Sequence, residues 1–173
     1  FVTFQKEFGL ELWQLSVLIA GNFVTELIID FICSKYVSTW GYRRCVIIAL
    51  AFSVIGLVLL PVLPAIMSQK FPALIIATIF CGLGGGMIEV LISPIVEACP
   101  TKNKGGMMSF LHSFYCWGAM AVVLGSTLFF TLFGLENWKI LTVIWAIVPL
   151  LNTFNFISCP IERLVEDGKS MGI

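Results

Sequence analysis

Five apolar segments, each long enough to cross a lipid bilayer, constrain this chain more than any other feature of its sequence. They run over residues 12–36, 45–67, 71–98, 105–134 and 140–160. A helix needs about 20 mostly apolar residues to cross the hydrocarbon core, and none of the segments alternates as a barrel strand does. Because lipid admits only helices and closed barrels, the sequence predicts an all-α, polytopic membrane protein with five transmembrane helices.

The composition excludes other classes of protein. Hydrophobic residues make up 59% of the 173 residues and charged residues 12%, whereas a soluble domain carries about 25% charged residues. Ten Lys and Arg balance ten Asp and Glu without a basic cluster, which argues against nucleic acid as a partner. The six cysteines lie in or beside apolar segments without metal or redox spacing, and we interpret them as small core residues.

Sequence motifs of common enzyme classes are also missing. The chain has no His-Glu-x-x-His zinc motif, no Gly-x-Ser-x-Gly elbow and no Gly-x-x-x-x-Gly-Lys-Ser/Thr phosphate loop. Its single histidine cannot build a multi-histidine metal site. We therefore expect no enzymatic activity, no cofactor and no bound metal.

The basic residues of the predicted loops divide unequally between the two sides of the membrane. Residues 38–44, 100–106 and 161–173 fall on one side, which holds seven of the ten Lys and Arg residues. Because basic segments stay in the cytoplasm, we expect these three there, in a multi-pass protein of the cell membrane. The N-terminus then lies outside without a signal peptide, which predicts that a preceding helix belongs to the protein.

Glu89 is the most informative polar residue, because eighteen uncharged residues precede it. A charge near the bilayer centre costs roughly 2.5–3.5 kcal/mol, so membrane acids usually face a bundle interior or a water-filled cavity. Glu89, Ser93 and Glu97 recur at intervals of four and share one helix face. Two interpretations of Glu89 stay open: a carboxylate that couples protons or contacts a solute, and a protonated Glu bonded to a neighbouring helix. Glu97 is simpler to interpret as an acid that anchors the adjacent loop.

Two further acids lie one turn apart in the first segment. Glu26 and Asp30 repel each other on one helix face, so we expect each to have a partner elsewhere. Asp30 precedes the basic turn and is a candidate partner of Lys35 or of an Arg. A gating contact and simple packing are both open.

The only histidine, His112, lies in the fourth segment with Ser109, Tyr115 and Cys116 at helical spacing. A membrane His often donates a hydrogen bond to a neighbouring helix, but its titration near neutrality also suits a proton relay. Tyr115 and Trp117 add aromatic surface with a polar end, which suits sugar-like or aromatic ligands. His112 is therefore a candidate for a pocket residue, a relay or an interhelical donor.

A glycine run in the third segment predicts close helix packing, because small residues let backbones approach. Its members are Gly82, Gly84, Gly85 and Gly86. The run keeps a second class of protein open, a membrane scaffold or sensor in which Gly82 and Gly86 form an association face. Such a protein has no water-filled cavity at Glu89.

The turn Gly41-Tyr42-Arg43-Arg44 resembles the end of the loop motif between helices 2 and 3 of major facilitator superfamily transporters. In that motif, Gly-x-x-x-Asp-Arg-x-Gly-Arg/Tyr-Arg/Lys, the Asp-Arg pair falls here on Ser38 and Thr39, and the first Gly on Ser34. The family's acid is thus replaced, and Asp30 is a candidate substitute. The resemblance implies a gate formed by Asp30, Gly41, Arg43 and Arg44.

The third and fourth segments carry a more specific resemblance. Residues 82–89, Gly-Leu-Gly-Gly-Gly-Met-Ile-Glu, with Ser93-Pro94 after them, are similar to helix 4 of the fucose-permease-like branch. The Glu of that helix takes part in proton-coupled sugar uptake and matches Glu89, whereas Ser93 replaces an Asn. Residues 109–118 resemble helix 5 of the branch, where His112 and Tyr115 match polar cavity positions. Residues 92–117 also look like uncharacterised permeases of Gram-positive anaerobes.

The resemblance covers nearly the whole chain and implies helices 2 to 6 of a twelve-helix transporter. Residues 1–160 would form a partial N-terminal bundle, and residues 161–173 the start of a central cytoplasmic loop. The implied function is proton-coupled, alternating-access transport of a small polar solute, with sugars among the candidates; an exporter of drugs or metabolites is an alternative. The implied partners are the lipid bilayer, the solute, H⁺, and the missing first helix and C-terminal half.

Overall fold

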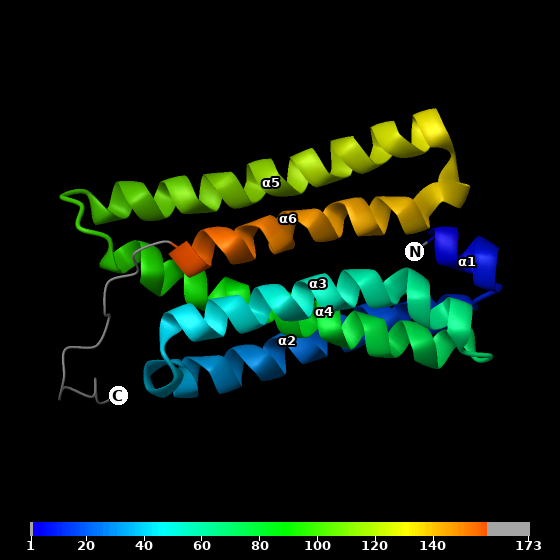
Figure 1. Cartoon of the computed structure of the whole chain (residues 1–173), viewed down its shortest axis with the longest axis horizontal. Helices are drawn as coiled ribbons and strands as arrows, with labels where there is room; N and C mark the ends of the chain where they lie inside the picture. The colour runs from blue at the N-terminus through cyan, green and yellow to red at the C-terminus, as the bar shows by residue number, and fades with distance from the viewer. Residues whose placement is uncertain (1, 159–173) are drawn as a thin grey trace.

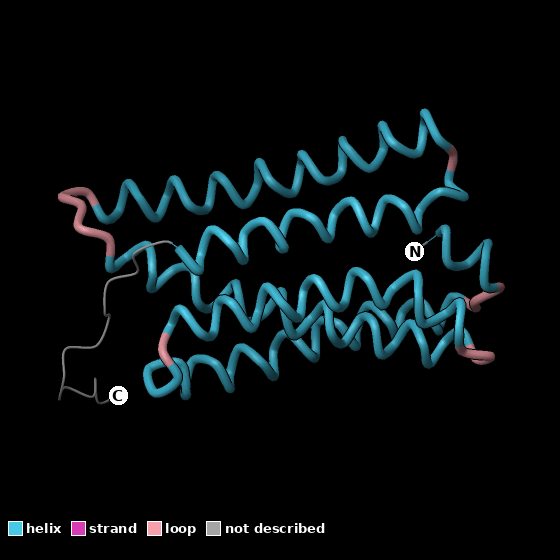
Figure 2. The backbone as a smooth tube through the Cα atoms, in the orientation of Figure 1, coloured by secondary structure: helices cyan, strands magenta, loops and turns pink. Residues whose placement is uncertain are grey.

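The computed structural model describes residues 2–158 and places almost all of them in helices. Five long helices follow one another: α2 (Leu12–Trp40), α3 (Tyr42–Ile66), α4 (Lys70–Ala98), α5 (Lys104–Phe133) and α6 (Trp138–Ser158). Short turns at the two ends of the bundle join them (Figures 1 and 2). All five are long and apolar enough to cross a membrane, and residues 2–158 contain no strand. These observations confirm the expected all-α fold with five spanning helices.

The turn between α2 and α3 is shorter than the sequence indicates. Of the expected turn at residues 38–44, only Gly41 lies outside a helix, and its φ is +86°. Glycine adopts this conformation without the steric cost that a Cβ brings, so the chain reverses in a single residue. Of the residues expected to form the gate, Gly41 is the turn itself, Arg43 and Arg44 lie in the first turn of α3, and Asp30 lies inside α2.

A short helix, α1 (Val2–Phe8), is fastened to the start of α6, which the sequence analysis did not anticipate. The Phe4 and Phe8 rings meet the Trp138 ring edge-on, with centroids 5.1 and 6.1 Å apart. Glu7 accepts a hydrogen bond from Trp138 Nε1 and pairs with Lys139 Nζ at 2.9 Å. Segments from opposite ends of the described chain are thereby joined at one end of the bundle (Figure 1).

The core lies where α4 packs between α2 and α3, and α6 covers the outer side of α3. One buried cluster joins α2, α3 and α4 and contains Cys33, Cys45, Ala49, Met87 and Leu91. By contrast, α5 has no buried residue and contacts α4 and α6 only sparsely. The expected central cytoplasmic loop, residues 161–173, lies outside the described residues.

The glycine run lets α4 approach both α2 and α3 closely at the same height along its axis. A Cβ added to Gly86 would lie 2.6 Å from Ile29 Cγ2 of α2 and 3.0 Å from the Glu26 Cα. A Cβ added to Gly84 would lie 2.6 Å from the Ser53 nitrogen and 2.8 Å from the Ala49 oxygen of α3. Real Cβ atoms essentially never come within 3.0 Å of such atoms, so the glycines allow the observed approach.

We expect Gly84→Ala to destabilise the bundle, because the new methyl group meets the α3 backbone at Ser53 and Ala49 as well as the Ser53 hydroxyl. Overpacking of this kind costs about 1–3 kcal/mol, and should appear as a lower midpoint of thermal unfolding in detergent. Gly118→Ala is the matched control, since nothing lies within 4 Å of its Cβ position and Ala is the better helix former. Equal midpoints for the two variants would contradict the close α3–α4 approach.

Candidate functional site

A cavity of about 950 Å³ lies between α2, α4 and α5. It holds all four residues that the sequence analysis proposed for solute or proton binding: Glu89, Ser93, His112 and Tyr115. The remaining lining residues are Phe23, Glu26, Gly85, Ile88, Ile92, Leu111 and Phe114. The structure therefore brings polar side chains of α4 and α5 to the wall of one cavity. These residues are far apart in the sequence, so this arrangement comes from the packing of the helices.

On α4, Glu89 and Ser93 reach the cavity from one helix face, one turn apart. The Glu89 side chain is exposed, and within residues 2–158 it forms no hydrogen bond or ion pair. Thus no described residue of a neighbouring helix bonds to Glu89, as the second interpretation of this acid requires. Glu97 is also exposed and lies outside the cavity lining.

On α5, His112 and Tyr115 lie close to the beginning of the helix, which Asn103 caps by accepting a hydrogen bond from the Gly106 nitrogen at 2.9 Å. Both side chains are exposed, Tyr115 to 73%. Neither forms a hydrogen bond to another described residue. In the described part of the chain, His112 therefore faces a cavity rather than serving as a satisfied interhelical donor.

Glu26 lines the same cavity from α2, and the sequence analysis did not place it there. Asn22 Nδ2 donates a hydrogen bond to Glu26 Oε1 at 2.9 Å. Opposite, Gly85 leaves room for this carboxylate: a Cβ there would lie 3.4 Å from Oε1. The sequence signal that could have indicated this position is the spacing of Phe23 and Glu26, because residues three apart place an aromatic side chain and an acid on one helix face.

Asp30 lies one turn further along α2, against α4. Its Oδ1 is buried without a hydrogen-bond partner among the described residues, and a Cβ on Gly86 would lie 2.9 Å from it. Asp30 is also close enough to Glu89 for the two carboxylates to interact electrostatically. Of the candidate partners of Asp30, Lys35 forms no ion pair with it among the described residues, and Lys35 Nζ lies 5.7 Å from the centre of the Tyr36 ring. A contact of Asp30 with an Arg stays a prediction.

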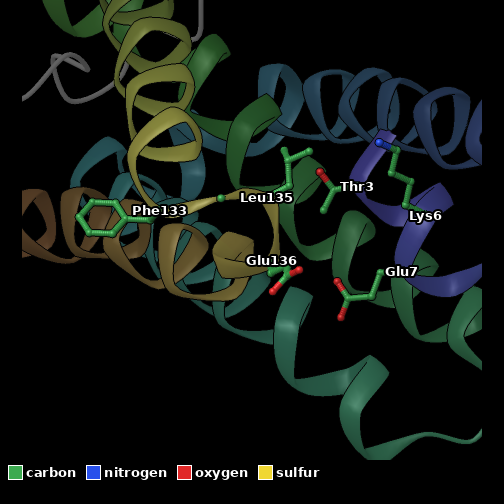
Figure 3. Close-up of a pocket in the computed structure, with 7 residues that line it drawn as sticks. Thr3, Lys6, Glu7, Phe133, Leu135 and Glu136 are labelled. Carbon is green, nitrogen blue, oxygen red and sulfur yellow. The ribbon is translucent and has the colours of Figure 1, made fainter.

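A second pocket, about 780 Å³ in volume, lies between α1 and the turn that joins α5 to α6. Figure 3 shows Glu7, Glu136, Thr3 and Leu135 around it. Leu135 and Glu136 belong to the short 3₁₀ turn η1 (Leu135–Asn137). Because Glu7 already binds Lys139 and Trp138, this pocket is part of the α1 attachment, and the cavity at Glu89 is the stronger candidate site.

Comparison with known proteins agrees with this architecture. Residues 1–167 match the Major Facilitator Superfamily. No curated protein and no solved structure matches the chain. The family match spans nearly the whole sequence and coincides with five apolar helices that can cross a membrane. The chain is therefore a multi-pass membrane protein that belongs to the major facilitator superfamily of membrane transporters.

Proposed function

We propose that this chain is part of a secondary active transporter that moves a small polar solute by alternating access, coupled to protons. The observation that carries the proposal is the gathering of Glu89, Ser93, His112 and Tyr115 on the wall of one cavity. Within an apolar bundle, polar groups that line a cavity are the usual mark of a solute or ion pathway. Transporters of this kind bind between helices and rock around the bound solute.

Each of the four residues has a role in this proposal. Glu89 takes up and releases the coupled proton or contacts the solute directly, since no described residue competes for its carboxylate. His112 and Tyr115 supply a titratable ring and a phenol, and Ser93 supplies a hydroxyl, so together they offer both donors and acceptors. The proposed cytoplasmic gate consists of the one-residue turn at Gly41, the adjoining Arg43 and Arg44, and Asp30 of α2.

The orientation and the family branch belong to the same proposal. The positive-inside rule favours a cytoplasmic location for residues 38–44 and 100–106 and for the C-terminal tail. The glycine run before Glu89 favours the fucose-permease-like branch, as do the positions of His112 and Tyr115. An exporter of drugs or metabolites from the same superfamily would use the cavity in the opposite direction.

The exposure of α5 supports a longer transporter around this bundle. None of its residues is buried, and large apolar side chains such as Phe110, Trp117 and Leu128 are more than half exposed. We propose that a first helix and a second half-bundle complete the transporter. Reading the coding DNA on both sides should reveal one further transmembrane helix upstream and six downstream in frame. In-frame stop codons close to both ends would contradict it.

We expect Glu89→Gln in the full-length protein to abolish proton-driven uptake while leaving the fold intact, because the amide keeps the size of the side chain but cannot exchange a proton. Uptake into proteoliposomes under an imposed pH gradient measures the first effect, and the thermal unfolding midpoint measures the second. Glu97→Gln is the matched control on the same helix, outside the cavity. Unchanged proton-driven uptake in Glu89→Gln would remove Glu89 from the coupling mechanism.

A membrane scaffold is the competing class, and it predicts a sealed interior at Glu89. We expect Ile88→Cys, in a variant whose six native cysteines are replaced by Ser, to react with a membrane-impermeant thiol reagent, because Ile88 lines the cavity. Ile147→Cys is the control, since Ile147 is an exposed apolar residue of α6 that should face lipid. Equal resistance of both variants to labelling would favour the scaffold.

A further inference from the structure

We propose that the cavity between α2, α4 and α5 selects organic monocations, amines or quaternary ammonium compounds that carry an apolar body. This inference rests on the proposed transport function and names the substrate class of the same site. Three features of the cavity support it: the charge of its wall, the position of Glu26 and the aromatic lining residues.

The cavity wall carries acids from two different helices, and His112 is the one basic side chain among its described lining residues. Glu26 comes from α2 and Glu89 from α4, and the lining residues in the described part include neither Lys nor Arg. Asp30 adds a third carboxylate close to Glu89. Acids in a membrane protein are tolerated where they meet water or a counter-charge. A cationic solute supplies that counter-charge, whereas an anionic solute would be repelled.

Glu26 is held in position to meet such a solute. Asn22 Nδ2 binds its Oε1 at 2.9 Å, which fixes the carboxylate on the cavity side of α2. Its other oxygen has no hydrogen-bond partner within residues 2–158. Gly85 faces this carboxylate from α4, and Glu26 and Glu89 line one cavity.

Aromatic rings complete the chemistry of a cation site. Phe23 of α2 and Phe114 and Tyr115 of α5 line the same cavity as the two acids. The faces of such rings attract ammonium groups, and quaternary ammonium ligands are commonly bound between them. Neutral sugars need many polar partners instead, and of the cavity's eleven lining residues six are apolar or glycine. The balance of acids, rings and apolar surface therefore favours an amine over a sugar.

The test is equilibrium binding to the full-length protein in detergent. The cations are choline, benzyltrimethylammonium and tetraphenylphosphonium, and 3,3-dimethylbutanol is the uncharged analogue of choline. We expect at least one cation to bind, and Glu26→Gln to weaken it about tenfold, which corresponds to roughly 1.4 kcal/mol. Glu97→Gln is the matched control and should leave the affinity unchanged. We expect 3,3-dimethylbutanol to bind more weakly than choline where choline binds.

A second variant tests the cation site independently of whether Glu26→Gln folds. Phe114 is 58% exposed, so Phe114→Leu should fold normally and yet weaken the cation severalfold by removing one ring. Absence of binding by all three cations, or full affinity in both variants, would overturn the inference. Uptake of a neutral sugar that the cations do not inhibit would also overturn it, while leaving the transport function in place. Failure of the transport function would appear separately, as a cavity closed to thiol reagents.

Discussion

The close contact of α4 with α2 and α3, through the glycines at residues 82–86, is the interaction on which the rest of the structure depends. In lipid, helices associate through packing rather than through the exclusion of water, so small residues at the contact matter most. Gly82 and Gly86 admit α2, and Gly84 admits α3. Because these contacts occupy two sides of α4, its third side, with Gly85, Glu89 and Ser93, is left to line the cavity.

The two sides of α4 differ in chemistry. The α3 side is apolar and adjoins the buried cluster of Cys45, Ala49 and Leu91. The α2 side includes Asp30, whose buried Oδ1 has no hydrogen-bond partner among the described residues. An unsatisfied buried polar atom costs about 1–3 kcal/mol, so the α2–α4 contact gains less from burial than the α3–α4 contact. Asp30 therefore lies at the helix contact that gains less from burial.

The sequence predicts the five helices, and its four candidate site residues, most of them also matched by the family resemblance, line one cavity in the structure. Lipid restricts the fold, intervals of four residues place side chains on one face, and the cost of a membrane charge directs Glu89 to a cavity. The position of Glu26 depends on how α2 is rotated against α4, which no local pattern specifies. The pairing of Glu7 with Lys139 joins segments that are distant in the sequence, and the position of Asp30 against α4 depends on the same helix packing.

The helix that supplies His112 and Tyr115 is also the least firmly held. Away from its turns, α5 is attached by the hydrogen bond from Trp145 Nε1 to Ser126 Oγ at 3.1 Å, and Trp145 packs against Gly125. Both contacts lie in its second half, whereas the cavity residues lie in its first. Under the proposed transport mechanism, α5 would shift against α4 during alternating access, and a helix packed as closely as α3 could not do so. The same exposed helix supplies His112 and Tyr115 to the cavity, and its exposed side chains are the surface that the proposed further helices would cover.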